Sequence, residues 1–238
     1  MKSIRLIIVV MLLGYLGYAL YSGQLANYIN LRFQWLSWVA LVILLLMLVN
    51  QLIALVKPNG LHVHEHDHEH SPTTWYMLAI MGVPLVLGIA IPSAPLGAEA
   101  IRGSVSTVGF APAVSASTFN IAPEKRNVLD WVRVISDSAD WAEFDGQAVD
   151  VSGFVYREPN VPEGQFMIAR FTMSCCVADA SALALFVEAA DAEQYADGDW
   201  VQVTGEMDYR TVEENPHMVI FASNVTPIPV PEQPYLYP

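Results

Sequence analysis

Three strongly apolar stretches near the amino terminus limit what this chain can fold into more than any other feature. They cover residues 4–25, 33–56 and 75–91. A helix of about 20 apolar residues crosses the hydrocarbon core of a bilayer. Each stretch is therefore read as a transmembrane helix. The third contains Pro84, so we expect it to kink and to pack on other helices that protect its opened backbone.

A cleaved signal peptide is the competing interpretation of the first stretch, because Lys2 and Arg5 resemble its basic start. No small-residue cleavage site follows, and a second apolar stretch comes at once, so a retained helix is favoured. Basic residues near a first helix also favour a cytoplasmic amino terminus. Three crossings then place residues 57–74 in the cytoplasm and everything after Ile91 outside, in a multi-pass protein of the cell membrane. A re-entrant third stretch would instead leave the carboxy-terminal part in the cytoplasm.

The second half of the chain has the composition of a water-soluble domain. Of the 24 acidic residues, 20 lie in residues 120–238, together with 6 of the 11 basic residues. This negative charge excludes a general nucleic-acid binder, because binding phosphates requires clustered Lys and Arg. We expect a membrane region in 1–92, an extended Pro/Ala/Ser-rich linker in 93–119, a folded domain in 120–230 and a Pro-rich tail in 231–238.

Periodicity within the acidic half predicts one helix followed by a small β-barrel. Apolar residues at helical spacing begin at Val128, and a second short amphipathic piece passes Trp141 and Phe144. Five strands follow, at about 149–156, 165–173, 183–188, 200–207 and 217–222. A helix before five short strands fits a barrel of the OB type, with a β-sandwich as the alternative. The predicted fold class is thus an α+β membrane protein with three transmembrane helices and a tethered OB-like barrel.

The loop between the second and third apolar stretches carries an alternating motif of histidines and acids. Its possible metal ligands are His62, His64, Glu65, His66, Asp67, His68, Glu69 and His70. Neutral imidazole binds Zn, Cu, Ni and Co, and neighbouring carboxylates raise the local cation concentration. A run with many interchangeable ligand sets predicts a metal collector or buffer, with zinc or another divalent transition metal as its ion. A solvated loop without a specific role is the alternative.

Both cysteines of the chain are adjacent, in the segment RFTMSCCVADA. Sulfur donors at Met173, Cys175 and Cys176, with Asp179 close by, could hold a thiophilic or borderline metal. Adjacent residues of a regular strand point to opposite faces, which argues against joint ligation. Redox chemistry would require a strained vicinal disulfide. Packing as small buried residues is the third interpretation.

The sequence contains no CxxC, GxSxG, Walker A, HExxH or GxGxxG motif. We therefore expect a protein that is not an enzyme, with no catalytic residues and no organic cofactor.

Several segments together resemble a known family: VPLVLGIAIPSAPLG, DWVRVISD, DGQAVDVSGFVYRE, FMIARFTMSCCVADA and DGDWVQVTG. They are similar to the YcgQ-like bacterial membrane proteins that carry domain of unknown function 1980. The resemblance implies a second subunit of a two-component permease, paired with a multi-span permease subunit in the bilayer, and a link to zinc homeostasis in some members. It supplies no catalytic residues.

Three hypotheses follow in order of preference. The first is an accessory permease subunit linked to divalent metal handling, which needs a partner because none of its three apolar stretches carries a charge that could coordinate an ion inside the bilayer. The second is a membrane-anchored metal buffer or sensor. The third is a thiol-redox protein that uses Cys175 and Cys176.

Overall fold

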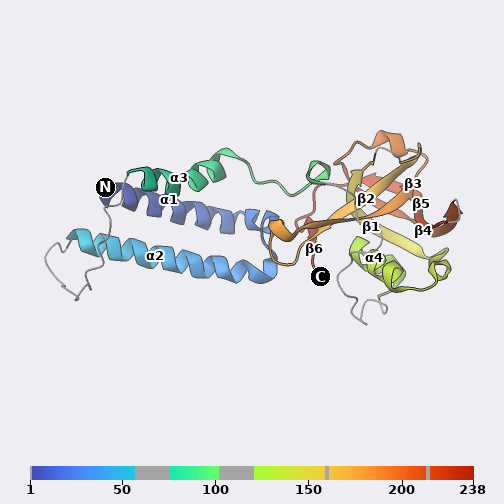
Figure 1. Cartoon of the computed structure of the whole chain (residues 1–238), viewed down its shortest axis with the longest axis horizontal. Helices are drawn as coiled ribbons and strands as arrows, with labels where there is room; N and C mark the ends of the chain where they lie inside the picture. Colours follow the sequence, from blue (N-terminus) through green and yellow to red (C-terminus); the bar gives the residue numbers. More distant parts are fainter. Residues whose placement is uncertain (1, 57–74, 102–120, 159–160, 213–214) are drawn as a thin grey trace. The chain divides into compact units, whose positions relative to one another are not determined.

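The computed structural model describes residues 2–56, 75–101, 121–158, 161–212 and 215–238. The chain divides into two compact units, Met1–Ala94 and Pro95–Pro238. The first unit is helical and the second contains the sheet (Figure 1).

The first unit consists of three apolar helices. They are α1 (Lys2–Tyr21), α2 (Gln34–Val56) and α3 (Trp75–Ala90), with short 3-10 turns η1 (Gln24–Asn27) and η2 (Leu31–Phe33) between the first two. The first helix ends earlier than the sequence predicted, because Gly23 adopts a left-handed conformation with φ of 74°. Within the described residues, one helical stretch, Leu31–Val56, is long and apolar enough to cross a bilayer. The apolar part of α1, Leu6–Tyr21, falls short by length, and α3 has 16 residues.

One narrow stripe of α2 packs against its neighbour. Its half-buried residues recur at intervals of three and four: Gln34, Ser37, Leu41, Leu44, Leu48 and Gln51. This spacing is typical of the line of contact between two helices in a left-handed coiled coil, and we call these residues the seam. A methyl carbon added at Gly17 of α1 would lie 3.8 Å from Cδ1 of Leu41, which places the seam against α1. The rest of α2 is exposed in this unit, although it is almost entirely apolar.

Contact between α1 and α3 depends on a small residue. A Cβ atom at Gly88 would come within 2.7 Å of the Tyr15 hydroxyl oxygen, so the aromatic ring occupies the space that a larger side chain would need. The segments that follow the two helices are also joined, because Asn27 Nδ2 donates to Ser93 Oγ at 2.8 Å. Gly88, within the third apolar stretch, therefore serves helix packing.

The second unit is a closed five-stranded β-barrel. Its strands are β1 (Ala148–Tyr156), β2 (Gln165–Thr172), β3 (Ser181–Glu188), β4 (Trp200–Val212) and β5 (Asn215–Pro227). The order β1-β4-β5-β3-β2 closes through the pairing of β1 with β2, and β3 with β5 is the parallel pair within this ring. This closure confirms the predicted barrel, and the alternative β-sandwich is wrong.

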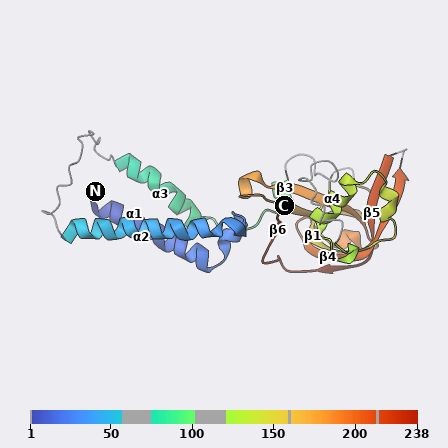
Figure 2. The same cartoon turned by 90° about the horizontal axis from the view of Figure 1, so that it is seen from below.

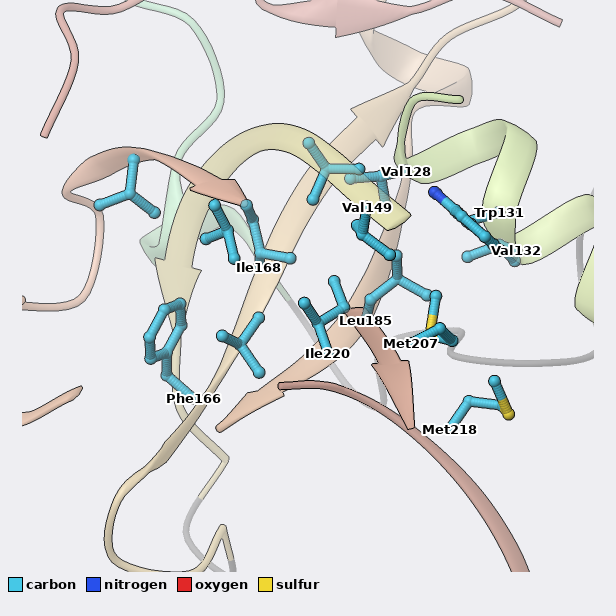
Figure 3. Packing of buried hydrophobic residues seen from close by; sticks show 14 of the residues in the cluster. Val128, Trp131, Val132, Val149, Phe166, Ile168, Leu185, Met207, Met218 and Ile220 are labelled. Carbon is cyan, nitrogen blue, oxygen red and sulfur yellow. The ribbon is translucent and has the colours of Figure 1, made fainter. Parts of the chain in front are cut away.

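Helix α4 (Val128–Asp137) lies beside the barrel strands in Figures 1 and 2. A capping box starts it: Asn127 accepts from the Asp130 amide at 3.1 Å, and the Asp130 carboxylate accepts from the Asn127 amide at 3.2 Å. Eight of its ten residues are buried. Figure 3 shows Trp131 and Val132 meeting barrel side chains in the inner core, which we define as the cluster inside the barrel and under α4.

A second core covers the outer face of the β1–β2–β3 side. Its buried members are Phe154, Met167, Ala169, Phe171, Met173, Ala184, Trp200 and Tyr235. Along β2, residues alternate between the inner core (Phe166, Ile168) and the second core (Met167, Ala169), so both faces of this strand are buried. Segments that flank the barrel in the sequence supply the cover.

Two of these covering segments differ from the sequence predictions. Residues 95–101, placed in an extended linker from composition, pack on the second core through Leu96 and Ile101 and contain the turn η3 (Ala98–Ala100). The expected Pro-rich tail forms β6 (Tyr235–Leu236), which pairs in parallel with β2. In both cases a few apolar side chains fit a hydrophobic face that the barrel leaves open.

Candidate functional site

The only cysteines of the chain lie in the segment between β2 and β3, which we call the dithiol loop (residues 173–180). Met173 begins it, with a fully buried side chain and an amide that donates to the Leu236 carbonyl at 2.9 Å. The chain leaves the sheet there, and the short turn η7 (Val177–Asp179) leads toward β3. The loop is therefore anchored at its start by the second core, while its middle reaches solvent.

The two thiols lie close together and are accessible. Cys175 is exposed, Cys176 is half-buried, and both are free cysteines with their sulfur atoms 3.6 Å apart. The objection that adjacent strand residues point to opposite faces does not apply, because β2 ends at Thr172. Packing as small buried residues is also wrong for Cys175, since its side chain is in water.

Asp179 holds the loop in shape. Its two carboxylate oxygens accept from the backbone N–H groups of Ser174 at 3.1 Å and Cys175 at 2.8 Å. Desolvation acts to raise the pKa of Asp179, but hydrogen bonds from the Cys175 amide and thiol, together with other backbone donors, outweigh it and lower the pKa. A fixed carboxylate thus lies beside the thiol pair.

The same carboxylate changes the acidity of the neighbouring thiol. A hydrogen bond to Asp179, with a further contribution from Cys176, raises the pKa of Cys175 to about 11. The thiolate is the form that attacks disulfides, and reactive cysteines have lowered pKa values. Cys175 is therefore a neutral thiol at physiological pH, which weakens the case for fast thiol–disulfide exchange.

The structure separates the sequence-predicted metal ligands of the barrel. Cys175, Cys176 and Asp179 come together in the dithiol loop, but Met173 does not join them, because its side chain packs in the second core. In the parts of the chain that the structure describes, no group of three or more His, Cys, Asp or Glu side chains could hold a metal ion. The histidine motif lies outside the described residues: His62, His64, Glu65, His66, Asp67, His68, Glu69 and His70.

Arg170, two residues before the end of β2, has a role that the sequence did not reveal. Its guanidinium is buried and donates to the carbonyls of Pro234 at 3.1 Å, Gln233 at 2.8 Å and Ser152 at 3.3 Å. It also lies 5.1 Å from the ring centroid of Trp200. Burial lowers the pKa of Arg170 to about 10. The residue fixes the carboxy-terminal segment to the barrel next to the dithiol loop.

Family models match both halves of the chain. The DUF1980 N-terminal domain matches residues 4–105 and the DUF1980 C-terminal domain matches residues 111–238. Together these matches include all three apolar helices, the barrel and the dithiol loop.

A curated relative from Streptococcus mutans matches nearly end to end. It is described as a "Putative two-component membrane permease complex subunit" and is 21% identical over 276 residues, which cover 95% of this chain and 97% of that protein. Among solved structures, the small single-stranded DNA-binding protein from Streptomyces coelicolor matches 35% of this chain and 95% of that chain, at 14% identity. Its TM-score is 0.24.

Proposed function

This chain belongs to the DUF1980 family, and from that premise we propose that it is an accessory membrane subunit of a two-component permease complex. The observation that carries this proposal is the near-complete correspondence, 95% of one chain with 97% of the other, to a relative described in those terms. An alignment that included only the barrel or only the helices would support a shared module. Correspondence over both units supports a shared role in the complex. We propose that this role is to bind the permease subunit rather than to catalyse a reaction.

Exposed apolar surface on the helical unit supports a membrane location. The Leu31–Val56 stretch has a mean hydropathy of 2.8 and contains no buried residue, unlike the core helix of a water-soluble protein. At 1.5 Å per residue, the 23 residues of α2 extend about 35 Å, which matches the hydrocarbon thickness, whereas the apolar part of α1, Leu6–Tyr21, extends about 24 Å and reaches about 30 Å only with its basic first turn. We infer that both cross the bilayer.

The third crossing is part of the same proposal. The 16 residues of α3 extend about 24 Å, which is shorter than the hydrocarbon core. Its close contact with α1 at Gly88 favours a helix in the same layer. With the amino terminus in the cytoplasm by the positive-inside rule, three crossings place the barrel on the outer side.

A partner with several membrane spans follows from the exposed face of α2. Outside the seam, the residues of α2 are exposed, and a three-helix unit without a charged residue in its apolar cores offers no evident ion path. Lipid or another helix must cover the remaining apolar surface, and we propose that the permease subunit supplies this helix.

Site-specific photo-crosslinking on α2 tests this proposal with a matched pair of leucines. Leu46 is 62% exposed and Leu44 lies in the seam against α1. A crosslinker at position 46 should capture a multi-span membrane protein in intact cells, whereas one at position 44 should react within the chain. Equal partner capture from both positions, or capture of lipid alone from position 46, would contradict the proposal.

Metal handling is a finer proposal that depends on the sequence of residues 62–70 alone. We infer that these side chains collect a divalent transition metal, zinc among them, for the complex. Deleting residues 62–70 separates two roles. Loss of a metal phenotype with partner capture retained would support collection, buffering or sensing, whereas loss of partner capture would assign the loop to assembly.

A further inference from the structure

The dithiol loop presents two accessible thiols at a distance that one atom can bridge. The Cys175 and Cys176 sulfur atoms are 3.6 Å apart, and neither is bonded to another cysteine. For comparison, two sulfur ligands of a tetrahedral zinc ion, with Zn–S bonds of about 2.3 Å, lie about 3.8 Å apart. The loop therefore has the spacing of a two-sulfur chelate before any ligand binds.

The number of donors decides which kind of centre fits. A closed tetrahedral zinc site takes four protein ligands, and a catalytic one takes three. Across the described ranges no group of three or more His, Cys, Asp or Glu side chains could hold a metal ion, and Met173 is buried in the second core. A centre that is satisfied by two sulfur bonds is the better match.

We propose that Cys175 and Cys176 form a binding site for thiophilic centres that bond to two sulfurs at once, with trivalent organoarsenicals as the ligand class. With an arsenic(III) oxide of the form R–As=O, two As–S bonds form and the arsenic–oxygen double bond breaks. The two thiol protons leave with that oxygen as one water molecule. No atom changes oxidation state, so the reaction needs no oxidant or reductant. This site is independent of the permease-subunit proposal.

Preorganisation of the loop supports the chelate. The Asp179 carboxylate accepts from the amides of Ser174 and Cys175, which fixes the backbone that carries the first thiol. Once the first As–S bond has formed, the second thiol is already next to the arsenic and the second bond forms within the molecule. Linking two binding events in this way typically raises retention by about 100-fold or more.

The test uses the reduced full chain in detergent and phenylarsine oxide as the probe, with intact-mass detection of the adduct. The wild-type chain should retain one arsenic in the presence of excess monothiol and release it to a dithiol such as dithiothreitol. Cys175→Ser and Cys176→Ser should each lose the adduct to monothiol about 100-fold more readily. Ala178→Ser changes an exposed neighbour in the same loop, keeps both sulfurs and should behave as the wild type.

Two results would overturn the proposal. The first is a wild-type adduct that monothiol removes as easily as it removes the adduct of either serine variant. The second is a single-serine variant that retains arsenic as firmly as the wild type does, which would place binding on one thiol. The comparison of monothiol with dithiol release on the unmodified chain does not depend on the folding of any variant.

Discussion

Replacing Arg170 by methionine should loosen the carboxy-terminal segment of the barrel. The substitution keeps an apolar stem of similar length and removes donors that bind the carbonyls of Gln233, Pro234 and Ser152. Hydrogen bonds from a charged donor contribute about 1.5–3 kcal/mol each. Three of the guanidinium nitrogens donate, so the gross loss is about 5–9 kcal/mol.

Part of this loss is offset, because the substitution also removes the free-energy cost of burying the arginine charge. Burial lowers the pKa of Arg170 from 12.5 to about 10. A pKa change of that size corresponds to a free-energy cost of about 3 kcal/mol for keeping the guanidinium charged in its buried position. The net destabilisation is then about 2–6 kcal/mol, and we take about 3 kcal/mol as the working value.

Hydrogen exchange on the full chain in detergent measures this effect where it occurs. The Met173 amide donates to the Leu236 carbonyl, so it is protected only while β6 stays on β2. A loss of about 3 kcal/mol should speed its exchange about 150-fold. Arg157→Met is the matched control: its guanidinium contacts the Asp197 carboxylate at 3.4 Å and donates to the Ala192 carbonyl at 2.6 Å, and neither partner lies in the carboxy-terminal segment, so exchange at Met173 should change little.

Unchanged protection of Met173 in Arg170→Met would contradict this prediction, because the guanidinium would then not hold the carboxy-terminal segment. The same conclusion would follow if Arg157→Met produced an equal acceleration at that amide.

Four further predictions concern the barrel, helix α4 and the dithiol loop. Gly205→Ala should lower the free energy of unfolding by about 1–3 kcal/mol in urea titrations, because the new Cβ would overlap the Phe221 carbonyl oxygen. Alkylation of Cys175 by iodoacetamide should rise with pH to a midpoint of about 11, because its raised pKa delays the thiolate, and a midpoint near 8.5 would contradict this. At pH 8, Asp179→Asn should accelerate that alkylation by up to about tenfold, since the gain in thiolate outweighs the fall in its nucleophilicity; an unchanged rate would exclude Asp179 as the cause. Asn127→Ala should cost about 1 kcal/mol in the same urea titrations through loss of the α4 capping box, and an unchanged midpoint would contradict it.

Strand positions in the barrel could be predicted from sequence because short runs of apolar and β-branched residues stand between clear turn signals. The start of β2 at Gln165 and the end of β3 at Glu188 match the prediction. The second core could not be predicted, because β2 is buried on both faces and shows no alternation that would separate an inner from an outer side. Composition alone therefore assigned residues 95–101 and 231–238 to linker and tail.

The geometry of the thiol pair was equally inaccessible to sequence reasoning. Alternation in a strand argued against joint ligation by Cys175 and Cys176, but β2 ends at Thr172 and both cysteines lie in the loop beyond it, where alternation does not apply. Strand ends are the least certain feature of a sequence-based assignment. The role of Arg170 was hidden for a different reason, since its acceptors are backbone carbonyls 63 and 64 residues away.

The first and last segments of the barrel unit are joined at Tyr235. The Leu96 amide donates to the Tyr235 hydroxyl at 2.9 Å, and Leu96 packs against the second core, to which Tyr235 belongs. Removing the last few residues of the chain would therefore also free the stretch through which the polypeptide enters this unit. Experimental tags are best attached beyond Pro238 through a spacer, because trimming back to Val230 would disturb a region more than 130 positions earlier in the chain.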